Sequence, residues 1–146
     1  MLIRHTVIII LSLFLCACLT QAKVSSSITH GIIRVVDGDT LVIAAPYLPP
    51  ELGDTLLLRI YGIDTPERGH QAKCNAEREK SRLATEFVRL TLVQAKEVKI
   101  ELKKWDKYGG RVLGDAILDG KKLSEILIDN GMAVSYLGGR KDKNWC

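Results

Sequence analysis

Apolar residues recur along most of this chain in five short runs of the kind that form β-strands. Two runs lie within residues 31–45, on either side of Asp37-Gly38, a dipeptide that favours a hairpin turn. The other three cover residues 55–63, 97–102 and 111–118. The pattern therefore predicts three strands, followed later in the chain by two more.

A longer segment, residues 76–93, repeats its apolar residues near the spacing of an α-helix. The positions expected to face inward are Ala76, Leu83, Phe87, Leu90 and Val93. The positions expected to face outward are Glu77, Arg78, Lys80, Arg82 and Glu86. A second, short helix is predicted over residues 123–130, with Gly131 as the residue that ends it.

The predicted order of elements is three strands, a helix, two strands and a second helix. This order indicates an α+β fold, mainly β: a five-stranded, partly open β-barrel of the OB type with an inserted helix and a short second helix. The face of such a barrel commonly binds nucleic acid. A chain of 146 residues is long enough for one such domain, and no internal repeat is apparent.

The N-terminus has a different pattern, a basic start followed by an apolar run over residues 7–15. Small residues up to Ala22 then offer a cleavage site. We expect residues 1–22 to be a signal peptide and residues 23–146 to be the mature domain, either periplasmic or secreted. A second interpretation is a lipoprotein leader that leaves a lipid on Cys18. Both interpretations predict export.

Export would leave two cysteines in the mature chain, Cys74 and Cys146. Two thiols in an oxidising compartment predict one disulfide bond between them. A zinc site that includes His70 is the alternative, although a convincing fourth ligand is lacking.

The formal net charge of the whole chain is +4, and its basic residues gather in a few clusters. These clusters lie at residues 103–104, 107, 121–122 and 140–143. Each fits contact with a phosphate backbone, and each equally fits solvated lysines in a surface turn.

Several carboxylates lie at the ends of predicted strands. Asp37 and Asp39 flank the first hairpin turn, and Asp64 ends the third run just before Thr65. Taken singly, each is a residue that a turn or a cap requires. Together, two carboxylates, a backbone carbonyl and waters would make an oxygen site for Ca²⁺ or Mg²⁺. Glu67, two residues beyond the Thr65 carbonyl, would face a metal-bound water.

Two arginines lie on the strands beside these carboxylates. Arg59 interrupts the apolar stretch of residues 56–60, and Arg111 begins the last strand. Arg59 fits either an edge-facing side chain or a phosphate ligand. Two arginines, a divalent cation and a carboxylate base are the groups that phosphodiester hydrolysis needs.

Four motifs, taken in order, resemble the staphylococcal (micrococcal) nuclease family, also called thermonucleases. They are Val36-Asp37-Gly38-Asp39-Thr40, the stretch from Leu58-Arg59-Ile60 to Ile63-Asp64-Thr65-Pro66-Glu67, the stretch from Asp106-Lys107-Tyr108-Gly109 to Arg111, and Asp119-Gly120-Lys121. The resemblance extends from about Ile32 to Val134.

The resemblance implies an OB-type barrel and Ca²⁺-dependent hydrolysis of DNA and RNA that leaves 3′-phosphate ends. By position, Asp39, Asp64 and the carbonyl of Thr65 would bind Ca²⁺. Asp37 would lie in the shell outside these ligands.

The resemblance also implies roles for the remaining residues of the motifs. Glu67 would be the general base, and Arg59 and Arg111 would bind the phosphate and stabilise the transition state. Lys107 and Tyr108 would help seat a nucleotide phosphate.

The chain departs from the family pattern at Gly110 and at the position of the base-stacking tyrosine. An extra glycine, Gly110, lengthens the turn between Tyr108 and Arg111 and changes the expected placement of Lys107 and Tyr108. The tyrosine that stacks on the base in the family has no clear match, and Tyr136 is the nearest candidate.

Two functions are therefore open at the level of sequence. The first is an exported, Ca²⁺-dependent endonuclease acting on DNA or RNA, monomeric and without a protein partner. The second is a non-catalytic OB-type module that binds nucleic acid or protein. The presence of Asp39, Arg59, Asp64, Glu67 and Arg111 together favours the enzyme.

Overall fold

The computed structural model describes residues 31–146, so the predicted signal peptide and Cys18 lie outside the described residues. Eight strands and two α-helices are assigned in this part of the chain. In order they are β1 (Ile32–Asp37), β2 (Thr40–Ala44), β3 (Thr55–Ile60), β4 (Ile63–Asp64), α1 (Asn75–Gln94), β5 (Val98–Trp105), β6 (Arg111–Leu118), β7 (Lys121–Lys122), α2 (Leu123–Asp129) and β8 (Val134–Ser135). Two short 3₁₀ turns lie at Pro50–Leu52 and Gly69–Gln71.

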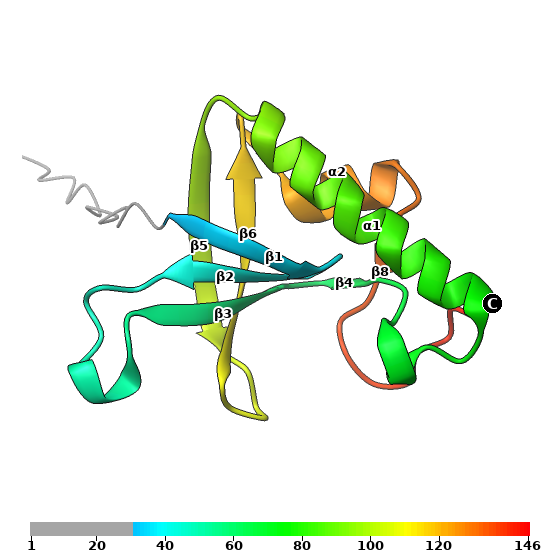
Figure 1. The fold of residues 1–146 in the computed structure, drawn as a ribbon, viewed down its shortest axis with the longest axis horizontal. Helices are drawn as coiled ribbons and strands as arrows, with labels where there is room; N and C mark the ends of the chain where they lie inside the picture. Colours follow the sequence, from blue (N-terminus) through cyan, green and yellow to red (C-terminus); the bar gives the residue numbers. More distant parts are fainter. Residues whose placement is uncertain (1–30) are drawn as a thin grey trace, which may run out of the picture.

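The main sheet has the strand order β1-β2-β3-β6-β5, with the short β7 paired to β6 (Figure 1). The pair β3–β6 is parallel and the other pairs are antiparallel. This mixed sheet with two helices confirms the predicted α+β class and its OB-like arrangement. Between residues 31 and 146 no hydrogen-bonded pairing joins the outer strands β1 and β5, so the barrel stays open.

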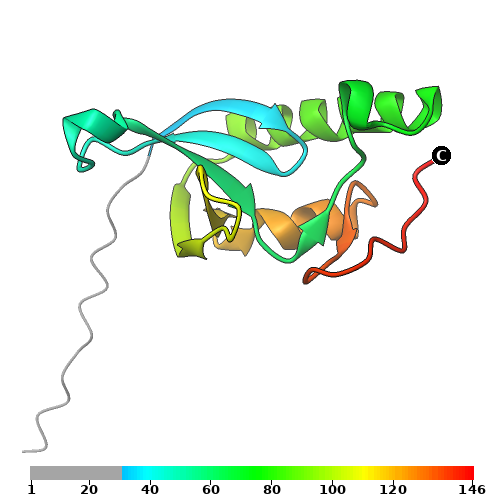
Figure 2. The same cartoon turned by 90° about the horizontal axis from the view of Figure 1, so that it is seen from below.

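The hydrophobic core lies between the main sheet and the two helices. Helix α1 packs beside β1, and α2 packs beside β6 (Figures 1 and 2). The most deeply buried large side chains are Leu41, Ile43, Leu58, Ile60, Ile63, Val88, Leu123 and Leu127. Burial of these side chains supplies most of the driving force for folding.

Helix α1 has the predicted bounds to within one residue, but most of the predicted inward face is wrong. Of the five residues expected inside, only Phe87 packs against the core. The buried positions are Glu77, Ser81, Ala84 and Val88. Of the residues expected inside, Leu83 and Leu90 are about half exposed and Val93 is 84% exposed. Glu77, expected outside, is 3% exposed. The error arose because small and hydrogen-bonded polar residues line this interface, and hydrophobic periodicity does not detect them.

Close packing explains why the α1 interface needs small residues. A methyl group at Gly38, in the hairpin between β1 and β2, would lie 3.1 Å from Cβ of Ala84 and 3.2 Å from Cβ of Thr65. The hairpin turn therefore sits directly against both the helix and the loop after β4. This contact positions Asp37 and Asp39, which flank the glycine.

The third predicted run is interrupted rather than continuous. Gly62 has a φ of +85°, a conformation that favours glycine, and it separates β3 from β4. The short β4 then pairs with β8, so Asp64 lies opposite Val134. The fourth run is longer than expected and continues to Trp105. The hairpin at Asp37-Gly38, the strand at 111–118 and the end of α2 before Gly131 are confirmed.

No helix within residues 31–146 is both long enough and apolar enough to cross a membrane.

Candidate functional site

The strand pairing brings the predicted site residues together from distant parts of the sequence. Thr40, the residue after Asp39, pairs with Arg59 across the β2–β3 ladder. Arg59 also pairs with Leu113 across the parallel β3–β6 ladder, and β6 begins with Arg111. Asp64 ends β4, and Thr65 and Glu67 follow it in the next loop.

Asp39 is a buried carboxylate whose two oxygens both have partners. Its Oδ1 forms an ion pair with Nη1 of Arg59 and accepts a hydrogen bond of 3.1 Å from the Thr40 hydroxyl. Its Oδ2 accepts a hydrogen bond of 2.7 Å from the Thr65 hydroxyl. These contacts compensate the cost of removing the charge from water. They also join the β1–β2 hairpin to the loop after β4.

Arg59 is the most buried of the predicted phosphate ligands. Its Nη2 also donates to the carbonyl of Ile63 over 3.4 Å. Burial lowers the pKa of Arg59, and the positive charge of Arg111 lowers it further. The negative charges that oppose this effect are those of Asp37, Asp64 and Glu67. Both arginines and these three carboxylates therefore share one electrostatic environment.

Asp64 is 3% exposed, and its two carboxylate oxygens have different surroundings. Oδ2 accepts a hydrogen bond of 3.2 Å from Nε1 of Trp145. Oδ1 is buried, and its partner among the described residues is the ammonium of Lys141, which lies 2.6 Å from it as an ion pair. A buried carboxylate oxygen with only a cation beside it is a suitable ligand for a metal ion.

Lys141 bridges Asp64 to the predicted general base. Its Nζ lies 2.5 Å from Oε1 of Glu67 and donates a hydrogen bond to it. Burial alone would lower the pKa of Lys141, but the hydrogen bonds and charges of Asp64 and Glu67 outweigh burial and raise that pKa. The lysine is therefore held in its charged form between the two carboxylates.

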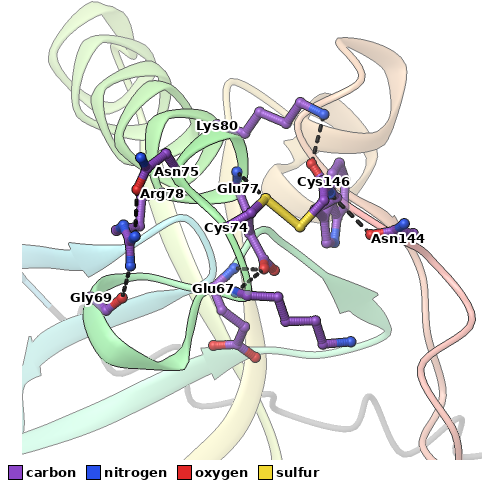
Figure 3. Close-up of a disulfide and its surroundings, with 11 residues drawn as sticks. Glu67, Gly69, Cys74, Asn75, Glu77, Arg78, Lys80, Asn144 and Cys146 are labelled. Atoms are coloured by element: carbon purple, nitrogen blue, oxygen red, sulfur yellow. Dashed lines mark hydrogen bonds between the residues drawn. A yellow bond between two sulfur atoms is a disulfide. The ribbon is translucent and has the colours of Figure 1, made fainter.

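The position of Glu67 depends on a second, buried glutamate. The backbone N–H of Glu67 donates to Oε1 of Glu77 over 3.2 Å, and the backbone N–H of Lys73 donates to Oε2 over 2.6 Å. Glu77 lies in the first turn of α1, where the helix dipole favours a negative charge. Figure 3 shows Glu77 beneath the helix, with its carboxylate directed at the backbone of Glu67. The loop that carries Glu67 is thus fixed to α1 at both ends.

Arg111 is held by an acidic neighbour on the adjoining turn. Its Nε forms a short ion pair with Oδ2 of Asp106. The hydrogen bond from Arg111 lowers the pKa of Asp106, so this carboxylate stays charged at neutral pH. The side chain of Arg111 is about one-third exposed, which leaves part of it accessible to a ligand.

Lys107 and Tyr108 lie apart from this cluster, in the turn between β5 and β6. Tyr108 is largely exposed, and the Lys107 ammonium lies 4.8 Å from the centre of its ring. The extra Gly110 and its neighbour Gly109 both have positive φ in this turn. The backbone N–H of Tyr108 donates to Oδ1 of Asp106 over 3.4 Å. Within the described residues, no hydrogen bond or ion pair joins Lys107 or Tyr108 to Asp39, Asp64 or Glu67. Tyr136 donates its hydroxyl to the carbonyl of Gly139 over 2.7 Å.

The C-terminal tail, residues 140–146, reaches the site because a disulfide bond returns it to α1. Cys74 and Cys146 are bonded, as predicted, with a Cα–Cα distance of 6.0 Å (Figure 3). Lys80 on α1 donates to the carbonyl of Trp145 over 2.7 Å. The alternative zinc site at Cys74 is therefore excluded in this structure.

Sequence patterns missed four residues of this environment: Glu77, Asp106, Lys141 and Trp145. One available signal for Trp145 was the predicted disulfide. Trp145 adjoins Cys146, and Cys74 lies ten positions after Asp64, so the bond would bring Trp145 near Asp64. In the described part of the chain no three His, Cys, Asp or Glu side chains form a metal cluster. A metal would therefore depend on two carboxylates, backbone oxygen and water, a donor set that suits Ca²⁺.

Comparison with known proteins agrees with this geometry. A search of curated protein sequences found no match to the chain. The model of the family described as "Staphylococcal nuclease homologue" matches residues 57–144, which include Arg59, Asp64, Glu67 and Arg111. This match covers more than half of the chain, and the chain therefore belongs to the staphylococcal nuclease homologue family.

Proposed function

We propose that this domain is a Ca²⁺-dependent endonuclease that hydrolyses phosphodiester bonds of DNA or RNA and leaves 3′-phosphate ends. The observation that carries the proposal is the geometry around Arg59 and Lys141. Arg59 forms an ion pair with Asp39 and donates to the carbonyl of Ile63, next to Asp64, and Lys141 bridges Asp64 and Glu67. Phosphodiester hydrolysis needs positive charge for the phosphoryl oxygens and a carboxylate to take a proton from water. Membership of the nuclease family supports the same activity.

The proposed Ca²⁺ ligands are Asp39, Asp64 and the backbone carbonyl of Thr65, with Asp37 outside them. The buried Oδ1 of Asp64, whose partner among the described residues is a cation, supports the assignment. When bound, Ca²⁺ would add positive charge beside the phosphate and lower the pKa of a water. The Lys141 ammonium and a divalent cation compete for Asp64 because both are attracted to the same oxygen.

The side chains have separate roles in this proposal. Arg59 and Arg111 bind the phosphate and stabilise the charge that develops on its oxygens. Glu67 removes a proton from the attacking water. Lys107 and Tyr108, in the exposed turn, contact a phosphate farther along the bound strand.

We also propose that the domain acts after export, in a periplasm or in the medium, as a monomer. The Cys74–Cys146 disulfide supports an oxidising compartment. Intact-mass measurement of the protein purified from its native cells tests the leader. A chain that begins at Lys23 supports cleavage of residues 1–22, whereas an added lipid mass supports attachment at Cys18.

The activity is tested with oxidised protein and single-stranded DNA or RNA, in Ca²⁺ or in chelator. Cleavage only with Ca²⁺, leaving 3′-phosphate ends, is the expected result. Retained binding without cleavage in Ca²⁺, Mg²⁺ and Mn²⁺ would overturn the proposal and favour a non-catalytic binding module.

A further inference from the structure

Trp145 is the one buried side chain of the C-terminal tail. It is 8% exposed, whereas the residues on either side of it, from 140 to 144 and at 146, are exposed. Burial of a large aromatic ring near the end of a polar tail requires a specific packing site, here called its seat, on the rest of the domain. That seat lies beside Asp64, since the two side chains are joined by the hydrogen bond from Nε1.

The indole hydrogen bond selects one orientation of the Asp64 carboxylate. An indole N–H can only donate a hydrogen bond. Here it donates to Oδ2 of Asp64 over 3.2 Å, so Oδ2 is the oxygen that faces the indole. The other oxygen, Oδ1, is then directed to the side where the Lys141 ammonium lies at 2.6 Å. The tail therefore orients the oxygen that the proposed function assigns to the metal.

The tail is bonded to the N-terminal end of α1, the same helix end that positions Glu67. Cys74, the partner of Cys146, is the N-cap residue of α1, and its Sγ accepts the backbone N–H of Glu77 over 3.3 Å. Glu77 in turn holds the backbone of Glu67. In Figure 3 the disulfide, Glu77 and Glu67 lie next to one another at this helix end, and Lys80 reaches toward the tail. One rigid unit thus places both carboxylates.

We infer that Trp145 is a positioning residue for Asp64, and that the Cys74–Cys146 disulfide is what keeps it in place. The inference rests on the proposed function, because it assigns Asp64 Oδ1 to a divalent cation. Groups that hydrogen-bond to a metal ligand orient it and change metal affinity by about 10–100-fold. Loss of the indole hydrogen bond therefore weakens Ca²⁺ binding even though no ligand is lost.

The test compares Trp145→Phe with Trp105→Phe in the oxidised protein. Phenylalanine keeps an aromatic ring in the seat but removes the N–H donor. Trp105 is the matched control because it is exposed and lies on β5. Calorimetric titration with Ca²⁺ should show the Kd raised about 10–100-fold in Trp145→Phe and unchanged in Trp105→Phe.

Two further measurements separate positioning from folding. The Tm in chelator shows whether each variant is folded without metal, and a merely structural role would lower the Tm without changing the Ca²⁺ Kd of the folded protein. If Trp145→Phe does not fold, Cys146→Ser replaces it, because this variant keeps the indole but frees the tail. It is made in a Lys141→Met background and compared with Lys141→Met alone, so that loss of the competing ammonium does not affect the comparison. In that background Cys146→Ser is expected to weaken Ca²⁺ binding.

The outcomes distinguish this inference from the proposed function. Unchanged Ca²⁺ affinity in folded Trp145→Phe would overturn the positioning role and leave the nuclease proposal standing. Where that variant is unfolded, the same affinity in Cys146→Ser/Lys141→Met as in Lys141→Met would have the same meaning. Ca²⁺ binding by the wild type without cleavage would overturn the nuclease proposal alone. A wild type that binds no Ca²⁺ would overturn both.

Discussion

Lys141 Nζ lies 2.5 Å from Oε1 of Glu67, although the two residues are 74 positions apart in the sequence. The same ammonium lies 2.6 Å from Oδ1 of Asp64. A cationic side chain thus neutralises the proposed base and a proposed metal ligand together. This arrangement places one positive charge between two neighbouring carboxylates, and it makes the tail a competitor for the cation.

Lys141→Met should lower the Ca²⁺ concentration needed for half-maximal activity by several-fold, up to about tenfold. Methionine removes the charge but keeps much of the chain length. The expected increase in Ca²⁺ affinity is smaller than Coulomb's law gives at this distance, because a flexible, half-exposed lysine can move away from Asp64. Lys96→Met, an exposed lysine after the far end of α1, is the control. An unchanged Ca²⁺ requirement in Lys141→Met would contradict the competition.

Glu67→Gln should reduce kcat by at least about 10²-fold, because the amide cannot accept a proton from water. The backbone hydrogen bond from residue 67 to Glu77 does not involve the altered side chain, so the fold should be retained. Single-turnover cleavage of single-stranded DNA in saturating Ca²⁺ measures the effect. The exposed Glu51→Gln variant should match the wild type. Near-normal turnover in Glu67→Gln would remove Glu67 from the mechanism.

Arg59→Lys should lower kcat by roughly 10²-fold, because lysine lacks the planar guanidinium that contacts two phosphoryl oxygens. The lysine side chain retains a positive charge beside Asp39, so the Arg59→Lys variant should fold. Arg59→Ala should in addition lose about 3–5 kcal/mol of stability, since it leaves the buried Asp39 carboxylate without its ion pair. Arg34→Lys, exposed on β1, is the control for both cleavage rate and urea unfolding. If Arg59→Lys cleaves at the wild-type rate, Arg59 is structural only.

Glu77→Gln should lower both stability and cleavage rate. The buried carboxylate accepts two backbone N–H groups, and the amide nitrogen of glutamine cannot accept one of them. An unsatisfied buried donor costs about 1–3 kcal/mol. Urea unfolding and kcat should both change, whereas Glu79→Gln, exposed on the same helix, should change neither. Normal activity in Glu77→Gln would show that Glu67 does not depend on this loop contact.

Reduction of the Cys74–Cys146 bond should raise the intact mass by about 2 Da and lower the free energy of unfolding. A loop of this length gives roughly 4 kcal/mol in the chain-entropy model of disulfide stabilisation. The disulfide-free variant Cys74→Ser/Cys146→Ser should show the same loss of stability and be insensitive to reductant. An unchanged mass on reduction would show that the purified protein lacks the bond.

Several local features could be predicted because neighbouring residues decide them. Asp37-Gly38 specified the hairpin between β1 and β2, and Gly131 specified the end of α2. The bounds of α1 followed from a segment that favours helix throughout. Its buried face did not, because Glu77 is buried by hydrogen bonds from a loop rather than by hydrophobicity.

The sequence by itself determined the α+β class, the order of the main elements and a list of charged residues suited to phosphodiester chemistry. Only the tertiary structure decided which groups surround those residues. Trp145 reaches Asp64 across 81 positions, and Lys141 reaches Glu67 across 74. Contacts at such separations depend on the β4–β8 pairing and the disulfide, which bring together segments whose local sequences carry no signal of each other. Local propensity acts within a few residues, whereas the candidate site is assembled by packing over the whole domain.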